Sequence, residues 1–454
     1  MEKKRSHFSG KIGYVLAAAG ASVGLGNIWR FPYLAAKYGG GAFLLVYIVL
    51  ALTFGYTMII SETVMGRISK RSPIGAFQAF SDNKVFHFGG WINAIIPMLI
   101  VPYYSTIGGW VLNYLFQYIS GNTNGVVQDT YFTSFITDGV QTETWFLIFA
   151  FCSLAVVFAG VQGGIERVAK LMMPVLVVLS FIIAVYSMTR PGALEGIKYF
   201  LIPNLDNFSW MTVVAAMGQM FYSLSIAMGI LITFGSYMKD DVHIEEATVN
   251  VEIFDTGIAI MAGLMIIPAV FAFSNGDASQ LGAGPSLMFI TLPKVFSEMG
   301  MARLMGIIFF VLVFFAALTS AIALSESAIS TFEDELNWSR KRSTVFMALI
   351  MVVFGSLSSL GYGPLAGVTI IGMQFLDFFD FLTNSVMMPI AAIFICLYII
   401  RVIGFHAVDH EMTKEGGTFK RKGLYQFMIK YLCIAFLLII LISAILQVIG
   451  IIKI

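Results

Sequence analysis

The stretch AAAGASVGLGNIWRFP, residues 17–32, places polar and flexible residues inside an apolar segment. Gly20, Gly24 and Gly26 stand within seven positions, and Asn27 and Arg30 follow them. Glycine reaches backbone angles that other residues avoid, so a helix can unwind here at low cost. Freed carbonyl oxygens can then bind a cation, and freed amide groups can bind a carboxylate. Alternatively, the spacing of Gly20 and Gly24 only allows two helices to pack closely.

A second stretch, GQMFYSLSIAMGILITFGSY at residues 218–237, also has small polar residues at the middle of an apolar segment. Transporters built from inverted repeats place interrupted helices at matching positions of their two halves, with the binding site between them. Unpaired backbone at membrane depth is tolerated only where it is buried in protein or lines a polar cavity. The pair of interrupted segments therefore favours a binding site.

The composition indicates the environment in which these segments lie. Apolar residues make up 58% of the 454 residues, charged residues 12%, and the mean hydropathy is +0.86. Soluble chains are about 45–50% apolar and about 25% charged. One helical span needs about 20 mostly apolar residues. The apolar runs give eleven candidate spans, at 11–36, 41–66, 89–118, 144–160, 167–189, 211–235, 245–273, 303–332, 344–361, 376–400 and 426–452.

We therefore expect an all-α polytopic membrane protein with a single domain over residues 1–454. The two interrupted helices, five spans apart, predict one repeat at about 11–189 and an inverted second repeat at about 211–400. The helix at about 426–452 would lie outside both repeats.

Charge predicts the orientation. Most of the 27 Lys and Arg residues fall on the side that includes the amino terminus, and the loop at 119–143 has none. Because basic residues stay on the cytoplasmic side, we expect a cytoplasmic amino terminus and an extracellular carboxyl terminus in the cell membrane. The first apolar run is too long for a cleaved signal peptide. A net charge of +1 gives no indication of a nucleic-acid partner.

Other chemistry is not indicated. Cys152, Cys396 and Cys433 all fall inside spans, so a disulfide framework is not expected. His406 and His410 have a spacing that could suit a metal, but a solvated loop is the favoured interpretation. No paired catalytic constellation is present, so we do not expect an enzyme.

Several motifs resemble the neurotransmitter:sodium symporter family. These are GLGNIWRFPY followed by GGGAF, ETVMGR, PYYSTIGGW, GGIERVAKLMMP, FYSLSIAMG, FFAALTSAIAL and LDFFDFL, which together run over nearly the whole chain. The resemblance implies a LeuT-like fold with helices 1 and 6 broken. It also implies sodium-coupled uptake of an amino acid, as in the bacterial eleven-helix members.

The resemblance also implies two sodium sites. The first, next to the substrate, would use the Ser22 carbonyl with Asn27, Ser223 and Asp255. The second would use oxygen atoms of five residues, Gly20, Val23, Ala316, Thr319 and Ser320. Oxygen ligands suit Na⁺, a hard cation, and the sequence ALTS offers two hydroxyl groups together.

The implied substrate site lies between the broken helices. The substrate carboxylate would meet the amides of Leu25 and Gly26 and the Tyr104 hydroxyl, and its amino group would meet carbonyls near Ala21, Tyr222 and Ser225. The full implied set is Ala21, Ser22, Leu25, Gly26, Val101, Tyr104, Tyr222, Ser223, Ser225, Met228, Ser320 and Leu324. Monoamine-carrying members have aspartate where this chain has Gly24, which leaves room for a substrate with its own carboxylate. Met228 is flexible and favours a bulky apolar or aromatic L-amino acid, although it could be ordinary core.

Further residues match gating elements of the family. Arg30 and Asp380 match an extracellular pair, with Tyr104 and Tyr222 beneath. A cytoplasmic network would comprise Arg5, Ser236, Tyr237 and Asp334. Gly164 and Pro174 match a helix-5 motif that is linked to local unwinding, which admits water toward the second sodium.

The chain departs from the family at Asp255, where asparagine is usual, and at Ala259, where chloride-dependent members have serine. A fixed negative charge beside the first sodium predicts chloride-independent transport. Asp255 or Glu62 could release a proton on the return step, and the sequence does not decide between them. The alternatives are a symporter for a betaine or an ω-amino acid, and a sensor that binds an amino acid without transporting it.

Overall fold

The computed structural model describes residues 6–274, 284–298 and 300–448. These residues form helices joined by turns, and their only β-structure is two isolated bridges. Nine helical segments in this part of the chain are long and apolar enough to cross a membrane, and a bent pair adds a tenth. The predicted all-α polytopic class is therefore confirmed.

The first half of the chain contains helices that meet end to end, often through a wider π-helical turn (η). In order, they are α1 (Lys11–Ser22), η1 (Gly26–Arg30), α2 (Phe31–Lys37), α3 (Gly41–Leu50), η2 (Ala51–Gly55), α4 (Tyr56–Ser69), α5 (Pro73–Gln78), α6 (Lys84–Ser120), α7 (Thr123–Val126), α8 (Tyr131–Thr137), α9 (Gly139–Phe158), η3 (Val161–Glu166), α10 (Arg167–Met188) and α11 (Ala193–Leu201).

The second half continues in the same way. Its elements are η4 (Leu205–Asn207), α12 (Trp210–Ser223), α13 (Ile230–Ser236), α14 (Ile244–Ser274), η6 (Leu287–Thr291), α15 (Leu292–Glu298), α16 (Ala302–Glu335), α17 (Arg340–Leu360), α18 (Phe375–Asp380), η7 (Phe381–Met387), α19 (Met388–Tyr398), η8 (Ile399–Ile403), α20 (Gly404–Thr413), η9 (Lys414–Gly416), α21 (Lys422–Phe427), η10 (Met428–Leu432) and α22 (Cys433–Val448).

The two breaks predicted from the sequence are both present. α1 ends at Ser22, Val23 is extended, and the chain resumes as η1 and α2 at an angle of 55° to α1. α12 ends at Ser223, and six residues separate it from α13. Within that gap Ser225 and Ala227 have φ values of 53° and 58°. Such left-handed angles are costly for residues other than glycine and persist only where the surrounding structure enforces them.

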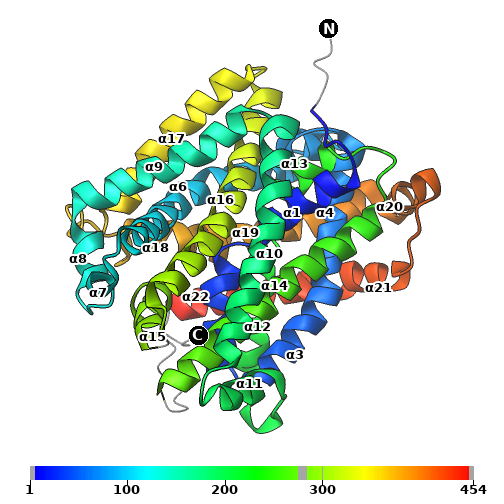
Figure 1. Cartoon of the computed structure of the whole chain (residues 1–454). Coiled ribbons are helices and arrows are strands. Elements are labelled where there is room, and N and C mark those ends of the chain that lie inside the picture. Colours follow the sequence, from blue (N-terminus) through cyan, green and yellow to red (C-terminus); the bar gives the residue numbers. More distant parts are fainter. Residues whose placement is uncertain (1–5, 275–283, 299, 449–454) are drawn as a thin grey trace.

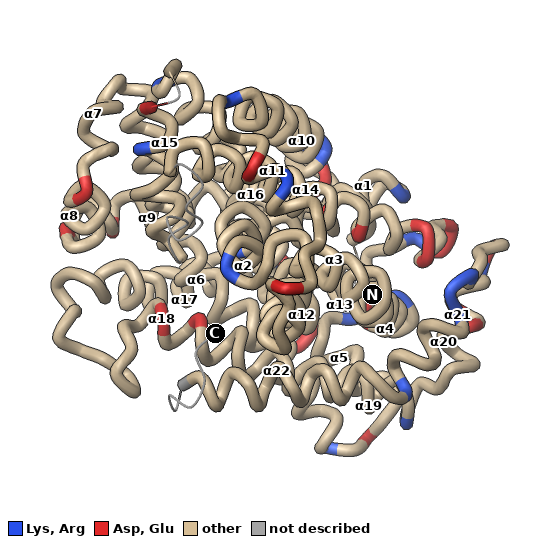
Figure 2. Tube along the Cα trace, turned by 90° about the horizontal axis from the view of Figure 1, so that it is seen from below, with Lys and Arg blue, Asp and Glu red and all other residues tan. Residues whose placement is uncertain are grey.

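The centre of the bundle surrounds the first break. The long helices α6 and α16 pack against each other, and α1 packs against α10, α14 and α16. Figure 1 shows α1 near the middle of the bundle, with α9 and α17 side by side at one edge. Seen from below, most of the tube is uncharged, and the charged residues are scattered among helix ends and loops (Figure 2). We call the end where α1 begins the inner end, after the predicted orientation.

Candidate substrate and ion site

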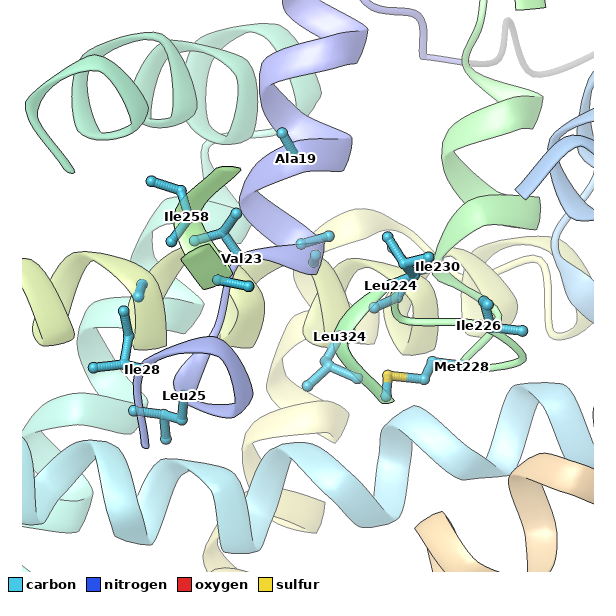
Figure 3. Packing of buried hydrophobic residues seen from close by; sticks show 14 of the residues in the cluster. Ala19, Val23, Leu25, Ile28, Leu224, Ile226, Met228, Ile230, Ile258 and Leu324 are labelled. Atoms are coloured by element: carbon cyan, nitrogen blue, oxygen red, sulfur yellow. The ribbon is translucent and has the colours of Figure 1, made fainter. Parts of the chain in front are cut away.

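A narrow pocket lies where the two breaks meet, with free space of about 20 Å³. One water molecule needs about 10–15 Å³ of such space, so the walls of this pocket would have to move to admit a larger molecule. Figure 3 shows Val23 and Leu25 at the break of α1, and Met228 and Leu324 side by side near the break of the second helix. The pocket is lined by Ala21, Ser22, Gly24, Leu25, Gly26, Asn27, Ile100, Tyr104, Tyr222, Ser223, Ser225, Met228, Ser320 and Leu324.

The structure differs from the sequence prediction at one lining residue. Val101 is fully buried but does not line the pocket, whereas Ile100 does. Residues three and four positions apart both neighbour each other on a helix face, so the spacing from Tyr104 allowed either residue. The four-residue spacing from Ile100 to Tyr104 is the one that α6 presents to the pocket.

Glycine at positions 24 and 26 leaves the pocket free of two side chains. A Cβ atom at position 24 would lie 2.8 Å from Ser320 Oγ and 2.9 Å from the Tyr104 hydroxyl oxygen. A Cβ atom at position 26 would lie 2.7 Å from the ring of Tyr222. Real Cβ atoms do not approach other groups this closely, so a side chain at either position would have to displace a pocket wall. The backbone N–H of Leu25, between them, donates to the Tyr104 hydroxyl at 3.1 Å.

A cluster of oxygen atoms centres on the buried carboxylate of Asp255 in α14. Oδ1 accepts hydrogen bonds from Asn27 Nδ2 and Ser223 Oγ, both at 2.8 Å. Oδ2 accepts one from the Tyr47 hydroxyl at 3.0 Å. Asn27 Oδ1 accepts the N–H of Gly24 at 3.1 Å, and this bond ties the cluster to the break in α1. Three of the four residues proposed for the first sodium are thus joined directly, and the fourth, Ser22, lines the same pocket.

A second cluster lies between α1 and α16. The Ser320 hydroxyl lies within hydrogen-bonding distance of the carbonyls of Gly20, at 3.3 Å, and Val23, at 3.4 Å. The Thr319 hydroxyl lies 3.2 Å from the carbonyl of Ala316 and also reaches the Phe315 carbonyl, one turn back. All five residues predicted for the second sodium therefore converge on one small region.

An outer cleft of about 340 Å³ lies above the pocket. Leu25, Tyr104 and Tyr222 line both spaces, so these three residues form the partition between them. Arg30 and Asp380 both line the cleft, but these two described residues form no ion pair. The guanidinium of Arg30 lies 5.4 Å from the ring centre of Tyr222, and Asp380 instead accepts from Asn384 Nδ2 at 2.6 Å.

The predicted inner network is only partly within the described chain. Arg5 lies outside the described residues. Asp334 Oδ2 accepts the backbone N–H of Ser72 at 2.7 Å, and Ser236 Oγ donates to the Thr233 carbonyl at 2.5 Å. The Tyr237 hydroxyl donates to Glu326 Oε1 at 2.7 Å.

Glu326 was missed by the sequence reasoning. It is fully buried in α16 and forms an ion pair with Arg340, whose Nη2 also donates to the Val157 carbonyl at 2.6 Å. The signal was present in the sequence, because a carboxylate inside an apolar span is a functional candidate by default. Tyr237 is thereby anchored to α16 through a paired charge.

Two further predicted elements lie on the helix-5 segment. Gly164 lies in the π-helical turn η3, so close to the Val156 carbonyl that no Cβ atom fits there, and Pro174 lies inside α10. Proline removes one helix hydrogen bond at that point. Both residues disturb the regular hydrogen bonding of the helix. Their role in transport stays a prediction.

Glu62 is the second acidic candidate from the sequence. Its Oε1 accepts the N–H of Ala227, inside the break between α12 and α13, at 2.6 Å. Its Oε2 is buried without a hydrogen-bond partner in the described chain. Asp255, in contrast, has both carboxylate oxygens bonded.

Comparison with known proteins agrees with this geometry. The model of the sodium:neurotransmitter symporter family matches residues 5–125 and 133–451. The chain is 35% identical to the uncharacterized sodium-dependent transporter YhdH of Bacillus subtilis, covering 88% of each chain. It is 30% identical to an uncharacterized sodium-dependent transporter of Haemophilus influenzae, covering 97% of each.

A solved structure is also similar. The crystal structure of MhsT in complex with L-phenylalanine superposes with a TM-score of 0.87 at 35% identity, covering 97% of this chain and all of that one. The similar proteins are transporters rather than enzymes. The chain is a membrane-embedded, sodium-dependent transporter with a LeuT-like fold, and it belongs to the sodium:neurotransmitter symporter family.

Proposed function

We propose that the protein carries a bulky apolar or aromatic L-amino acid into the cell together with Na⁺, without a requirement for chloride. The observation that carries this proposal is the pocket at the two helix breaks, which Gly24 keeps free of any side chain. An acidic residue at that position would supply a carboxylate. Its absence favours a substrate that brings its own.

The pocket has a polar end and an apolar end. At the polar end, the substrate carboxylate would meet the N–H groups of Leu25 and Gly26 and the Tyr104 hydroxyl, and displace the present Leu25–Tyr104 bond. Its amino group would meet the carbonyls of Ala21, Tyr222 and Ser225, of which Ala21 now accepts the Ser225 hydroxyl at 3.0 Å.

The substrate side chain would lie at the apolar end, among Ile100, Met228 and Leu324. An unbranched thioether such as Met228 adjusts to groups of different shape, which favours Trp, Tyr, Phe, Leu or Met as substrate. The similar protein MhsT was solved with L-phenylalanine, which supports this choice.

Two sodium ions would use the two oxygen clusters. The first would be held by the Ser22 carbonyl with Asn27, Ser223 and Asp255, and the second by Gly20, Val23, Ala316, Thr319 and Ser320. Asp255 supplies a fixed negative charge within the first cluster. Because that charge compensates the cation, chloride would not be needed.

Transport would follow from alternating access. Outer closure would bring Arg30 and Asp380 together above Tyr104 and Tyr222, and inner closure would rest on Arg5, Ser236, Tyr237 and Asp334. Unwinding at Gly164 and Pro174 would admit water toward the second sodium. With a cytoplasmic amino terminus in the cell membrane, each net charge carried inward gains about 2.3 kcal/mol per 100 mV of membrane potential.

Purified protein tests this proposal by direct binding of a panel of L-amino acids in Na⁺ or K⁺, with and without chloride. We expect Na⁺-dependent, chloride-indifferent binding that favours Trp, Tyr, Phe or Leu. Stronger binding of glycine, a betaine or an ω-amino acid would overturn the substrate class. A several-fold loss on chloride removal would overturn the role of Asp255.

A further inference from the structure

The residues ahead of α1 are held by two other helical segments. Gln162 Nε2, in η3, donates to the His7 carbonyl at 2.8 Å. On the other side, the Phe8 N–H donates to the Tyr237 carbonyl at 3.1 Å, and the Phe8 ring is fully buried. Lys239 Nζ donates to the Ser9 carbonyl at 2.8 Å. The start of α1 is therefore fixed by specific contacts and not by its sequence alone.

Glu166 is the central contact on the helix-5 side. It is the last residue of η3 and is buried. Its Oε2 accepts the backbone N–H of Ser9 at 2.8 Å, and its Oε1 accepts the Ser9 hydroxyl. Lys170, one turn further along, forms an ion pair with Oε1 at 2.5 Å and donates to Ser9 Oγ at 3.2 Å.

Glu166 compensates for what the first turn of α1 lacks. The residue that precedes α1 is Gly10, which has no capping side chain, and the first turn contains no acidic residue. Helix starts are normally stabilised by a side-chain acceptor and by negative charge near the exposed N–H groups. Gly13 lies directly against the Glu166 carboxylate, where a Cβ atom would overlap it. The first turn of α1 is thus shaped to receive a carboxylate from another helix.

The position of Glu166 also depends on how η3 is wound. The winding of a helix sets the direction of each side chain, so unwinding even part of η3 would redirect Glu166. Gly164, two residues earlier, is the point at which unwinding is expected. As η3 unwinds, the Glu166 carboxylate would move away from Ser9, and the start of α1 would lose this hydrogen-bond acceptor and its negative charge together.

We infer that Glu166 is a positioning residue that couples unwinding of η3 to release of the start of α1, so that the two segments open together. This inference rests on the proposed alternating-access function. Glu166 would thus connect two events. One is the entry of water toward the second sodium cluster, and the other is the movement of α1, which carries Gly20 of that cluster.

Hydrogen exchange of the backbone amides, followed by mass spectrometry in lipid nanodiscs, tests the coupling. Glu166→Gln keeps the size of the side chain but removes its charge, and Ser9→Ala removes one donor without touching η3. We expect exchange to quicken roughly tenfold in both α1 and η3 for Glu166→Gln, as the loss of hydrogen bonds to a charged group implies, and by less in both for Ser9→Ala. Lys11→Gln is the matched control. Lys11 lies in the first turn of α1, and its replacement breaks a solvent-exposed ion pair with Glu246 of α14 without changing any contact of Glu166. It should leave η3 unchanged.

Faster exchange in α1 alone would overturn the coupling, since Glu166 would then be only a helix cap. Unchanged exchange in both segments would also overturn it. Binding and uptake measured on the same samples separate this inference from the proposed function. For Glu166→Gln we expect a several-fold change in kcat with KM within about twofold, whereas loss of sodium dependence in the unaltered protein would refute the transport proposal itself.

Discussion

Replacing Gly24 with alanine tests the pocket with the smallest possible perturbation. The added methyl group would lie 2.8 Å from Ser320 Oγ and 2.9 Å from the Tyr104 hydroxyl, so at least one of these side chains must move. Overpacking of this kind costs about 1–3 kcal/mol. Displacing Tyr104 would also move its hydroxyl away from the place where it would bind the substrate carboxylate, and the loss of that hydrogen bond adds about 1 kcal/mol.

The two effects fall on the groups that would hold the substrate carboxylate. If they add and act wholly on the bound state, they weaken binding by about 2–4 kcal/mol, a factor of roughly 30 to 700 in Kd. The assay is equilibrium binding of L-phenylalanine or L-leucine to purified protein in saturating Na⁺, together with the Tm of the unliganded protein.

Gly218→Ala is the matched control, because Gly218 lies in the other broken helix and has no atom within 4 Å of the added Cβ position. It should leave Kd unchanged. A change of less than about threefold for Gly24→Ala, with its Tm unchanged, would refute the assignment of this pocket. If Gly218→Ala weakened binding equally, the loss of affinity in Gly24→Ala would not come from the pocket itself.

Three further predictions concern charge. Asp255→Asn should raise the Na⁺ concentration for half-maximal amino-acid binding roughly tenfold or more, because it removes the fixed negative charge that would attract the cation to the first oxygen cluster; an unchanged Na⁺ dependence would contradict this. The N–H of Gln141 and other donors in the first turn of α9 hold the pKa of Asp138 below its usual range. Its stabilising contribution is therefore present above about pH 3.9 and lost as the pH falls through the lower folded-state value. The Tm of Asp138→Ala should lie below that of the unaltered protein at neutral pH and converge with it in acid, whereas Asn83→Ala, at the uncharged cap of α6, should lower Tm equally at every pH. Glu411→Ala leaves a guanidinium that is 1% exposed without its carboxylate and should lower the free energy of unfolding by about 3–5 kcal/mol; a loss below 1 kcal/mol would mean that this pair behaves like an exposed one.

The fold was largely predictable because its strongest determinants are local. Apolar runs of sufficient length define the spans, and glycine-rich or polar interruptions such as that at Gly24 mark the breaks. The break before Ile230 was less obvious, since it uses left-handed Ser225 and Ala227 as well as Gly229. Nothing in those two residue types alone specifies such angles; the surrounding helices enforce them.

The details of the site were harder to predict where they depend on helix rotation or on distant partners. Val101 and Ile100 are equally good neighbours of Tyr104 by spacing, and only the packing of α6 selects Ile100. Arg340 lies fourteen residues beyond Glu326 in another helix, so the sequence could indicate a buried charge but not its partner. Arg30 and Asp380 share the outer cleft as expected, but whether they pair depends on the conformational state and not on their identity.

The most direct test of the account is transport into proteoliposomes driven by a sodium gradient alone. With Na⁺ outside, K⁺ inside and no chloride on either side, labelled L-phenylalanine or L-leucine should accumulate above its external concentration, and dissipating the sodium gradient should release it. Saturable binding without accumulation would indicate a sensor, and accumulation of equal size without a sodium gradient would contradict sodium coupling.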